Sequence, residues 1–177
     1  MNIFIREEQT QDYKNVEQVI KSAFANVSIS DQTEHNLVAN IRNSGAYIRE
    51  LSLVAIDKDT EQIVGHILYS KIAIINEEHS IESLALAPVS VIPTYQKKGV
   101  GKLLIEESLR IASKLGYESV IVLGHPNYYP KFGFQKASRW GIKAPFHVPD
   151  EVFMALELKK DALKNVSGVV EYSKAFL

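Results

Sequence analysis

The chain has no cysteine among its 177 residues. Disulfide bonds, thiolate metal sites and a cysteine nucleophile are therefore excluded. Its five histidines show no H-x-x-x-H or similar spacing, so we expect no metal site. No apolar stretch reaches the roughly 18 residues of a membrane span, and the N-terminus has no long apolar region. We therefore expect a cytoplasmic protein with no membrane partner.

The chain also lacks an excess of positive or negative charge. The chain carries 20 Lys and Arg against 21 Asp and Glu, which gives a net charge of −1 with neutral histidines. General nucleic-acid-binding proteins present a basic surface to the phosphates, so nucleic acid is not an expected partner. A small local anion site remains compatible with this balance of charge.

Apolar residues, in contrast, make up 46% of the chain, as is ordinary for a globular protein. The length predicts one domain with a sizeable core, and no repeat, linker or low-complexity tract divides it. The spacing of apolar residues predicts, in chain order, a strand at 2–7, helices at 13–24 and 31–45, strands at 50–57, 62–75 and 80–92, a helix at 99–115, and strands at 118–124, 151–158 and 167–176.

Polar residues before the first two helices predict how those helices begin. Thr10 is a predicted N-cap of the first helix. Asp31, with Glu34 three residues later, predicts a capping box for the second.

The middle of the chain predicts the fold class. The strand at 80–92, the helix at 99–115 and the strand at 118–124 together have the length of a parallel β-α-β unit. The strands before them have few polar interruptions, so some of their residues must be covered on both faces. The predicted fold is therefore one α/β domain built on a mixed sheet.

The sequence YQKKGVGK, residues 95–102, places two glycines among lysines where a helix begins. A helix start exposes unpaired N–H groups and about half a positive charge, which suits an anion. Gly99 and Gly101 would let a phosphate approach the backbone without a Cβ in the way. A tight strand-to-helix turn with solvated lysines fits the stretch equally well.

Two nucleotide-binding patterns fail on spacing. A Walker A loop has four residues between its glycines and then Gly-Lys-Ser/Thr, whereas here one residue separates the two glycines and Leu103 follows the lysine. A dinucleotide fingerprint has a third glycine where this chain has Leu104. A compact Gln-x-x-Gly-x-Gly turn remains.

Residues 89–116, VSVIPTYQKKGVGKLLIEESLRIASKLG, resemble the acyl-CoA-binding motif of the GCN5-related N-acetyltransferases (GNAT). That motif is a strand, then Gln/Arg-x-x-Gly-x-Gly/Ala, then a helix. Residues 120–134, VIVLGHPNYYPKFGF, resemble the family's next strand and its tyrosine four residues before Gly-Phe. With the two-helix opening and the hairpin, the resemblance covers most of residues 2–158. Details such as HPNYYPKFGF resemble a bacterial subgroup of predicted acetyltransferases.

The resemblance implies a GNAT fold, which is a mixed, mostly antiparallel twisted sheet flanked by helices around a central β-α-β acyl-CoA-binding unit. It implies an N-acetyltransferase domain over residues 1–158, with 159–177 as a C-terminal extension packed on the same domain. It implies acetyl-CoA as cosubstrate and no metal. The turn would hold the pyrophosphate and the preceding strand the pantetheine arm. The implied cofactor-binding residues are Val89, Ser90, Val91, Gln96, Lys97, Lys98, Gly99, Val100, Gly101 and Lys102.

Acetyl transfer needs a neutral amine and a proton for the departing thiolate. An aliphatic amine with a pKa near ~10.4 is neutral in roughly one part in two thousand at pH 7. The resemblance implies Tyr129 as the acid, although full proton transfer to a thiolate is uphill by about 2 kcal/mol at ordinary pKa values; packing in an aromatic cluster is the alternative. Glu82 and His125 are candidate bases. Their alternatives are a solvent-facing strand residue and a cap of the next short helix.

The predicted function is transfer of an acetyl group from acetyl-CoA to a primary amine of an unidentified small molecule or protein. Direct attack in a ternary complex is expected because no Cys or evident Ser nucleophile is present. Polyamines, amino-sugars, amino acids and protein N-termini all remain open as acceptors. A non-catalytic acyl-CoA sensor with the same fold is the alternative. A homodimer is compatible, since dimers are common in the family, but nothing in the chain identifies an interface.

Overall fold

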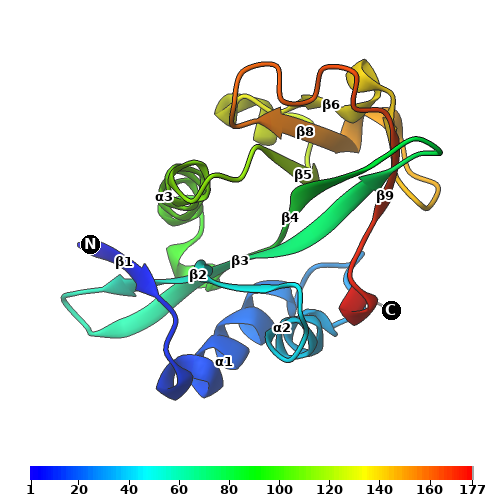
Figure 1. The fold of residues 1–177 in the computed structure, drawn as a ribbon. Coiled ribbons are helices and arrows are strands. Elements are labelled where there is room, and N and C mark those ends of the chain that lie inside the picture. Colours follow the sequence, from blue (N-terminus) through cyan, green and yellow to red (C-terminus); the bar gives the residue numbers. More distant parts are fainter. Residues whose placement is uncertain (177) are drawn as a thin grey trace.

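One mixed sheet forms the centre of the molecule in the computed structural model, which describes residues 1–176 (Figure 1). Within that range the strands follow the order β1-β2-β3-β4-β5-β8-β6, and β9 pairs with β3 and β7. The pairs β4–β5 and β7–β9 are parallel and the others antiparallel, so the sheet is mostly antiparallel, as predicted. The strands are β1 (Ile3–Glu7), β2 (Tyr47–Asp57), β3 (Gln62–Ile75), β4 (Ser80–Val91), β5 (Ser119–Leu123), β6 (Gln135–Lys136), β7 (Ile142–Lys143), β8 (Phe153–Glu157) and β9 (Gly168–Glu171).

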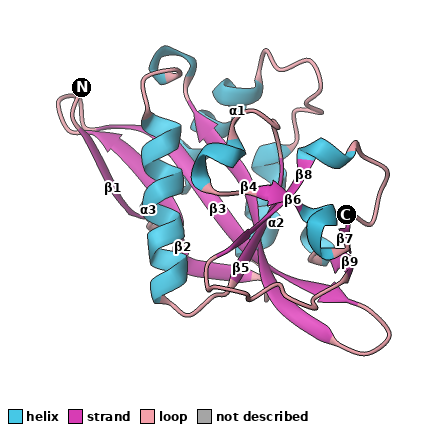
Figure 2. Cartoon of the chain, turned by 90° about the horizontal axis from the view of Figure 1, so that it is seen from above, coloured by secondary structure: helices cyan, strands magenta, loops and turns pink. Residues whose placement is uncertain are grey.

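Helices cover both faces of this sheet. Figure 1 places α1 and α2 on one side of the sheet and α3 on the other, and Figure 2 shows α3 lying across β2 and β3. Neighbouring residues of a strand point to opposite faces of the sheet. A strand that is covered on both faces therefore needs apolar residues at successive positions. On β3, Ile67 and Tyr69 pack with α3, while Leu68 between them packs with α1 and α2. The helices are α1 (Tyr13–Phe24), α2 (Glu34–Arg42) and α3 (Val100–Lys114).

The starts of the early helices differ from the prediction. Thr10 lies in a 3-10 turn, and Asp12, the last residue of that turn, is the N-cap of α1. The carboxylate of Asp31 accepts hydrogen bonds from the backbone N–H and hydroxyl of Thr33, at 3.0 and 2.5 Å. Thr33 is therefore the N-cap of α2. The capping-box prediction is wrong because short polar side chains also bind nearby backbone in turns that precede a helix.

The C-terminal part of the chain is less regular than predicted. The predicted strand at 151–158 is present as β8, but the one predicted at 167–176 ends at Glu171 and gives way to a 3-10 turn at Lys174–Phe176. β9 pairs with β3 at Ala73–Ile75. This pairing places residues 169–171 beside the last three residues of β3.

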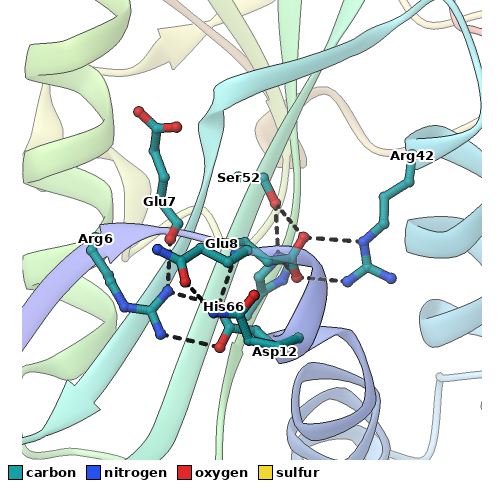
Figure 3. Close-up of polar contacts among 9 residues, drawn as sticks. Arg6, Glu7, Glu8, Asp12, Arg42, Ser52 and His66 are labelled. Atoms are coloured by element: carbon teal, nitrogen blue, oxygen red, sulfur yellow. Dashed lines mark hydrogen bonds and ion pairs between the residues drawn. The ribbon is translucent and has the colours of Figure 1, made fainter.

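Four polar side chains from separate elements form a buried group, the Glu8 cluster (Figure 3). Arg42, at the end of α2, donates two hydrogen bonds to the Glu8 carboxylate, with Nε–Oε1 at 3.0 Å and Nη2–Oε2 at 2.6 Å. The Ser52 hydroxyl donates to Glu8 Oε1 at 3.1 Å and lies 3.2 Å from His66 Nε2. Two-pronged, charge-assisted hydrogen bonds of this kind are among the stronger ones in proteins. The cluster therefore joins the end of β1 to α2, β2 and β3.

His66 is fully buried in this cluster. Because the Ser52 hydroxyl donates to Glu8, it can accept from His66, which puts the imidazole proton on Nε2. The nearby Glu8 carboxylate is already neutralised by Arg42. Burial, followed by the charge of Arg42, lowers the pKa of His66 to about 3.

We expect His66 to lower the free energy of unfolding by about 2 kcal/mol between pH 7 and pH 5. The unfolded chain binds a proton at this residue near pH 6.5, whereas the folded chain does so near pH 3, so stability is lost as the pH falls. Urea unfolding at both pH values measures the change. The exposed His147→Gln variant should keep the dependence and His66→Gln should reduce it. An unchanged dependence in His66→Gln would contradict the assignment.

Candidate active site

The glycine turn between β4 and α3 has the backbone conformation that its sequence indicates. A 3-10 turn at Pro93–Tyr95 precedes it, and α3 begins at Val100. Gly99, the N-cap, has a φ of +88°, and a Cβ there would meet no atom within 4 Å. The left-handed backbone, and not crowding, therefore favours glycine at this position.

The first turn of α3 has the features of an anion site. Its leading N–H groups have no partner within the helix and carry partial positive charge. At Gly101 a Cβ would lie 3.3 Å from the Tyr128 hydroxyl, so a larger residue would fill this space. The lysines predicted here, Lys97, Lys98 and Lys102, are all exposed. Backbone donors and positive side chains therefore meet at one open surface.

Two other predicted cofactor residues act through the turn itself. The side chain of Gln96 donates a hydrogen bond from Nε2 to the Val91 carbonyl at 2.8 Å, which ties the turn to the end of β4. The side chain of Val100 is 1% exposed and packs in the core beneath α3. Only the backbone of Val100 is available to a ligand.

β4 and β5 diverge several residues before the chain reaches this turn. Their last residue pair is Ala85–Ile121, whereas β4 continues to Val91. Within the described strands, residues 86–91 therefore have one unpaired edge. The predicted residues Val89–Val91 lie on this edge, and the Ser90 hydroxyl is buried without a hydrogen-bond partner. Apart from the Val91 carbonyl, which accepts from Gln96, main-chain groups on this edge are free to bind an extended ligand.

A cavity of about 900 Å³ lies where the two strands diverge. Its walls include Ala85 and Leu86 of β4, and Ile121 and Leu123 of β5. The C-terminal segment, residues 169–176, contributes much of the remaining wall. The cavity is thus continuous with the opening between the strands.

Tyr129 begins the short 3-10 helix that follows β5. Its ring packs on Gly124, where a Cβ would come within 2.3 Å of the ring. It makes edge-on contacts with Tyr128 and Phe134, with centroids at 5.2 and 5.6 Å, so the aromatic cluster considered from sequence is present. Burial raises the pKa of Tyr129 to about 12. The hydroxyl therefore remains protonated at neutral pH.

His125 is exposed and caps the turn that contains Tyr129. Its Nδ1 accepts the backbone N–H of Asn127 at 3.1 Å, and its carbonyl accepts that of Tyr128 at 3.1 Å. A neutral imidazole that accepts through Nδ1 carries its proton on Nε2. While this hydrogen bond lasts, the ring has no free basic nitrogen.

Glu82 lies on the other side of the paired part of β4. It is an exposed residue opposite Ala73 of β3. Burial raises the pKa of Tyr117, just after α3, and the charge of Glu82 raises it further, which places the carboxylate near that end of the helix. At 3.3 Å per residue, Glu82 is about 23 Å along the strand from Val89. Glu82 is thus far from the glycine turn but only three residues from Ala85, the last residue of β4 that pairs with β5.

The sequence analysis missed the aromatic side chains of the cavity. Phe146 comes from a segment with no clear periodicity, and Tyr172 and Phe176 from residues assigned to a strand. Trp140, the one tryptophan of the chain, packs at the edge of the core. The clustering of aromatic residues near the end of the chain was the sequence feature that could have indicated this aromatic wall.

Two further features bear on the classes of site considered from sequence. Among residues 1–176, no group of three or more His, Asp or Glu is placed to hold a metal. Over the same residues, no helix has the length and apolar character needed to cross a membrane.

Known proteins share this arrangement. The family model described as an acetyltransferase (GNAT) domain matches residues 49–136. The uncharacterised N-acetyltransferase YhbS of Escherichia coli strain K12 is 29% identical over 174 residues, 98% of each chain. A crystal structure of E. coli YhbS in complex with CoA is 27% identical, with a TM-score of 0.88 over 99% of this chain and 92% of that one.

A second solved structure gives the more decisive match. The GNAT family acetyltransferase of Brucella melitensis, in complex with acetyl-CoA, is 32% identical over 99% of both chains, with a TM-score of 0.81. The predicted fold class is thereby confirmed. Because the match runs through the whole of both chains and the same family also matches by sequence, this chain belongs to the GNAT family and is an acetyltransferase.

Proposed function

We propose that the chain transfers an acetyl group from acetyl-CoA to a primary amine, by direct attack within a ternary complex. The observation that carries the proposal is the unpaired edge of β4 at residues 86–91, with the strand opening at one end and the glycine turn at the other. An anion site is thereby joined to an opening in the sheet. The CoA and acetyl-CoA in the two solved relatives support this assignment.

The residues present fit such a cosubstrate. We assign the pyrophosphate to backbone N–H groups of Lys97–Lys102, where the space beside Gly101 would be filled by a larger residue. We assign the pantetheine arm to the main chain of Val89–Val91. The remaining contacts use backbone groups, which any residue supplies. The identity of the residue therefore matters mainly at the glycines.

Acetyl-CoA would supply the acetyl group as a thioester. In the balanced reaction the amine nitrogen bonds to the acetyl carbon, the carbon–sulfur bond breaks, the amine loses one proton and the thiol gains one. We propose that Tyr129 donates a hydrogen bond to the departing sulfur. With its pKa raised to about 12, against roughly 8.5 for a thiol, complete proton transfer would be uphill by about 5 kcal/mol. Tyr129 therefore acts as a donor that keeps its proton.

We propose that water takes the amine proton. His125 would first have to release the Asn127 N–H, and Glu82 is an exposed residue about 10 Å along β4 from Ala85, where the two strands stop pairing. An enzyme without a side-chain base acts on the small neutral fraction of its amine, so its rate follows the amine's own titration.

We expect Tyr129→Phe to lower turnover at least tenfold while acetyl-CoA still binds. Phenylalanine keeps the ring packed on Gly124 and removes the one group assigned to the sulfur. Thiol release with an amine panel measures turnover, and calorimetry measures binding. Tyr117→Phe, at the other end of α3, is the matched control and should retain full turnover.

The pH profile gives a second readout of the same assignment. Because the pKa of Tyr129 is raised to about 12, wild-type activity should not fall as the pH rises from 7 to about 10.

Full turnover in Tyr129→Phe would reject the proposed role of Tyr129 as hydrogen-bond donor to the sulfur. A wild-type protein that binds acetyl-CoA and acetylates no amine would favour the sensor alternative.

A further inference from the structure

The cavity at the strand opening collects exposed apolar side chains. Leu123, Phe146 and Val169 are 47%, 47% and 44% exposed, and all three line it. Large apolar groups on an open concave surface indicate a binding site for an apolar ligand.

The aromatic part of the wall is ordered by ring contacts. Phe146 stacks on Tyr172 with centroids 6.0 Å apart and planes at 21°, and Tyr172 contacts Phe176 at 5.0 Å. The pairing of β7 with β9 brings these two segments together. Flat rings held in this way favour contact with another ring or an alkyl chain.

Charge in the cavity is sparse and balanced. Among the described residues that line it, Glu171 and Lys174 are the charged ones. A polyamine carries several ammonium groups and needs several carboxylates, while an amino-sugar needs a polar partner for each hydroxyl. One carboxylate, one ammonium and the hydroxyl-bearing residues Tyr172 and Ser173, on an otherwise apolar wall, are too few to meet either need.

We propose that this cavity binds the apolar body of the acceptor, so that the substrate is an arylalkyl or alkyl primary amine. The inference rests on the proposed acetyl transfer and adds the class of its acceptor. The amine end lies at the strand opening, because Ala85 and Ile121, the last residues to pair there, also form cavity wall. The body then extends toward Phe146 and Tyr172.

The test is calorimetry of amine binding without acetyl-CoA, using 2-phenylethylamine, hexylamine, spermidine and glucosamine. 2-Phenylethylamine should bind at least tenfold more tightly than spermidine or glucosamine. 2-Phenylethanol, which lacks the amine, should compete with it. Phe146→Ala should lower the affinity for 2-phenylethylamine at least fivefold. Phe4→Ala removes a similarly exposed ring outside the cavity and should leave the affinity for 2-phenylethylamine unchanged.

The outcomes separate this inference from the function on which it rests. Tighter binding or preferred acetylation of spermidine or glucosamine would overturn the acceptor class and keep acetyl transfer. An octanoyl-CoA affinity far above that of acetyl-CoA, lost in Phe146→Ala, would assign the cavity to a donor chain and also overturn it. Binding of 2-phenylethylamine without acetylation would uphold the preference of the cavity and count against transfer.

Discussion

Gly101→Glu should lower the affinity for acetyl-CoA at least 100-fold and leave the protein folded. The glutamate side chain would enter the space beside the Tyr128 hydroxyl, 3.3 Å from a Cβ at this position. Its negative charge would repel a pyrophosphate and compete for the first N–H groups of α3. A 100-fold loss corresponds to about 2.8 kcal/mol of binding free energy.

Calorimetry with acetyl-CoA, free CoA, ATP and NAD measures this prediction. Ser113→Glu adds the same charge to an exposed position near the other end of α3 and should keep wild-type affinity. If a folded wild type bound ATP or NAD but no CoA, the acyltransferase assignment of the turn would fail. Equal affinity in Gly101→Glu and wild type would place the cofactor elsewhere.

The second large effect concerns stability. Arg42→Met should lower the free energy of unfolding by about 3–5 kcal/mol, because it leaves the buried Glu8 carboxylate without its ion pair. Methionine retains part of the contact with the Tyr13 ring, over which the guanidinium lies at 3.9 Å. The loss is therefore mainly one of charge compensation.

Urea unfolding of matched variants tests this explanation. Arg110 and Glu107 form an ion pair of the same length, 2.6 Å, on the surface of α3, so Arg110→Met should cost at most about 1 kcal/mol. Replacing both members of the buried pair, with Glu8→Leu and Arg42→Met together, should recover much of the lost stability. A similar cost for the two single arginine variants would show that burial adds nothing.

Elements defined by local residues were predictable from sequence. β3 has its predicted bounds because turn-forming residues flank an unbroken apolar run. α3 lies within one residue of its predicted ends, where Gly99 precedes it and Gly116 follows. β6 and β7 were not predicted, since each has two residues and pairs only with strands distant in the sequence.

The site divides in the same way. The conformation of the glycine turn was predictable because it depends on neighbours in the chain, whereas the catalytic role of Tyr129 stays a prediction that rests on the resemblance. The Glu8–Arg42 pair joins residues far apart in sequence, and the stacked rings of Phe146 and Tyr172 meet through strand pairing. The periodicity of apolar residues carries no information about contacts between residues that are distant in the sequence.

The pairing of β9 has a consequence for motion. β4 pairs with β3 from Gly65 to Ile75, whereas β9 pairs with it over Ala73–Ile75. A strand held by two or three residue pairs on each side opens locally at lower free energy than one paired along its whole length, and its amide protons exchange sooner with solvent. Because Val170 of β9 is packed in the core, we expect hydrogen exchange to show the β9 amides opening before those of β3 and β4 without loss of the sheet.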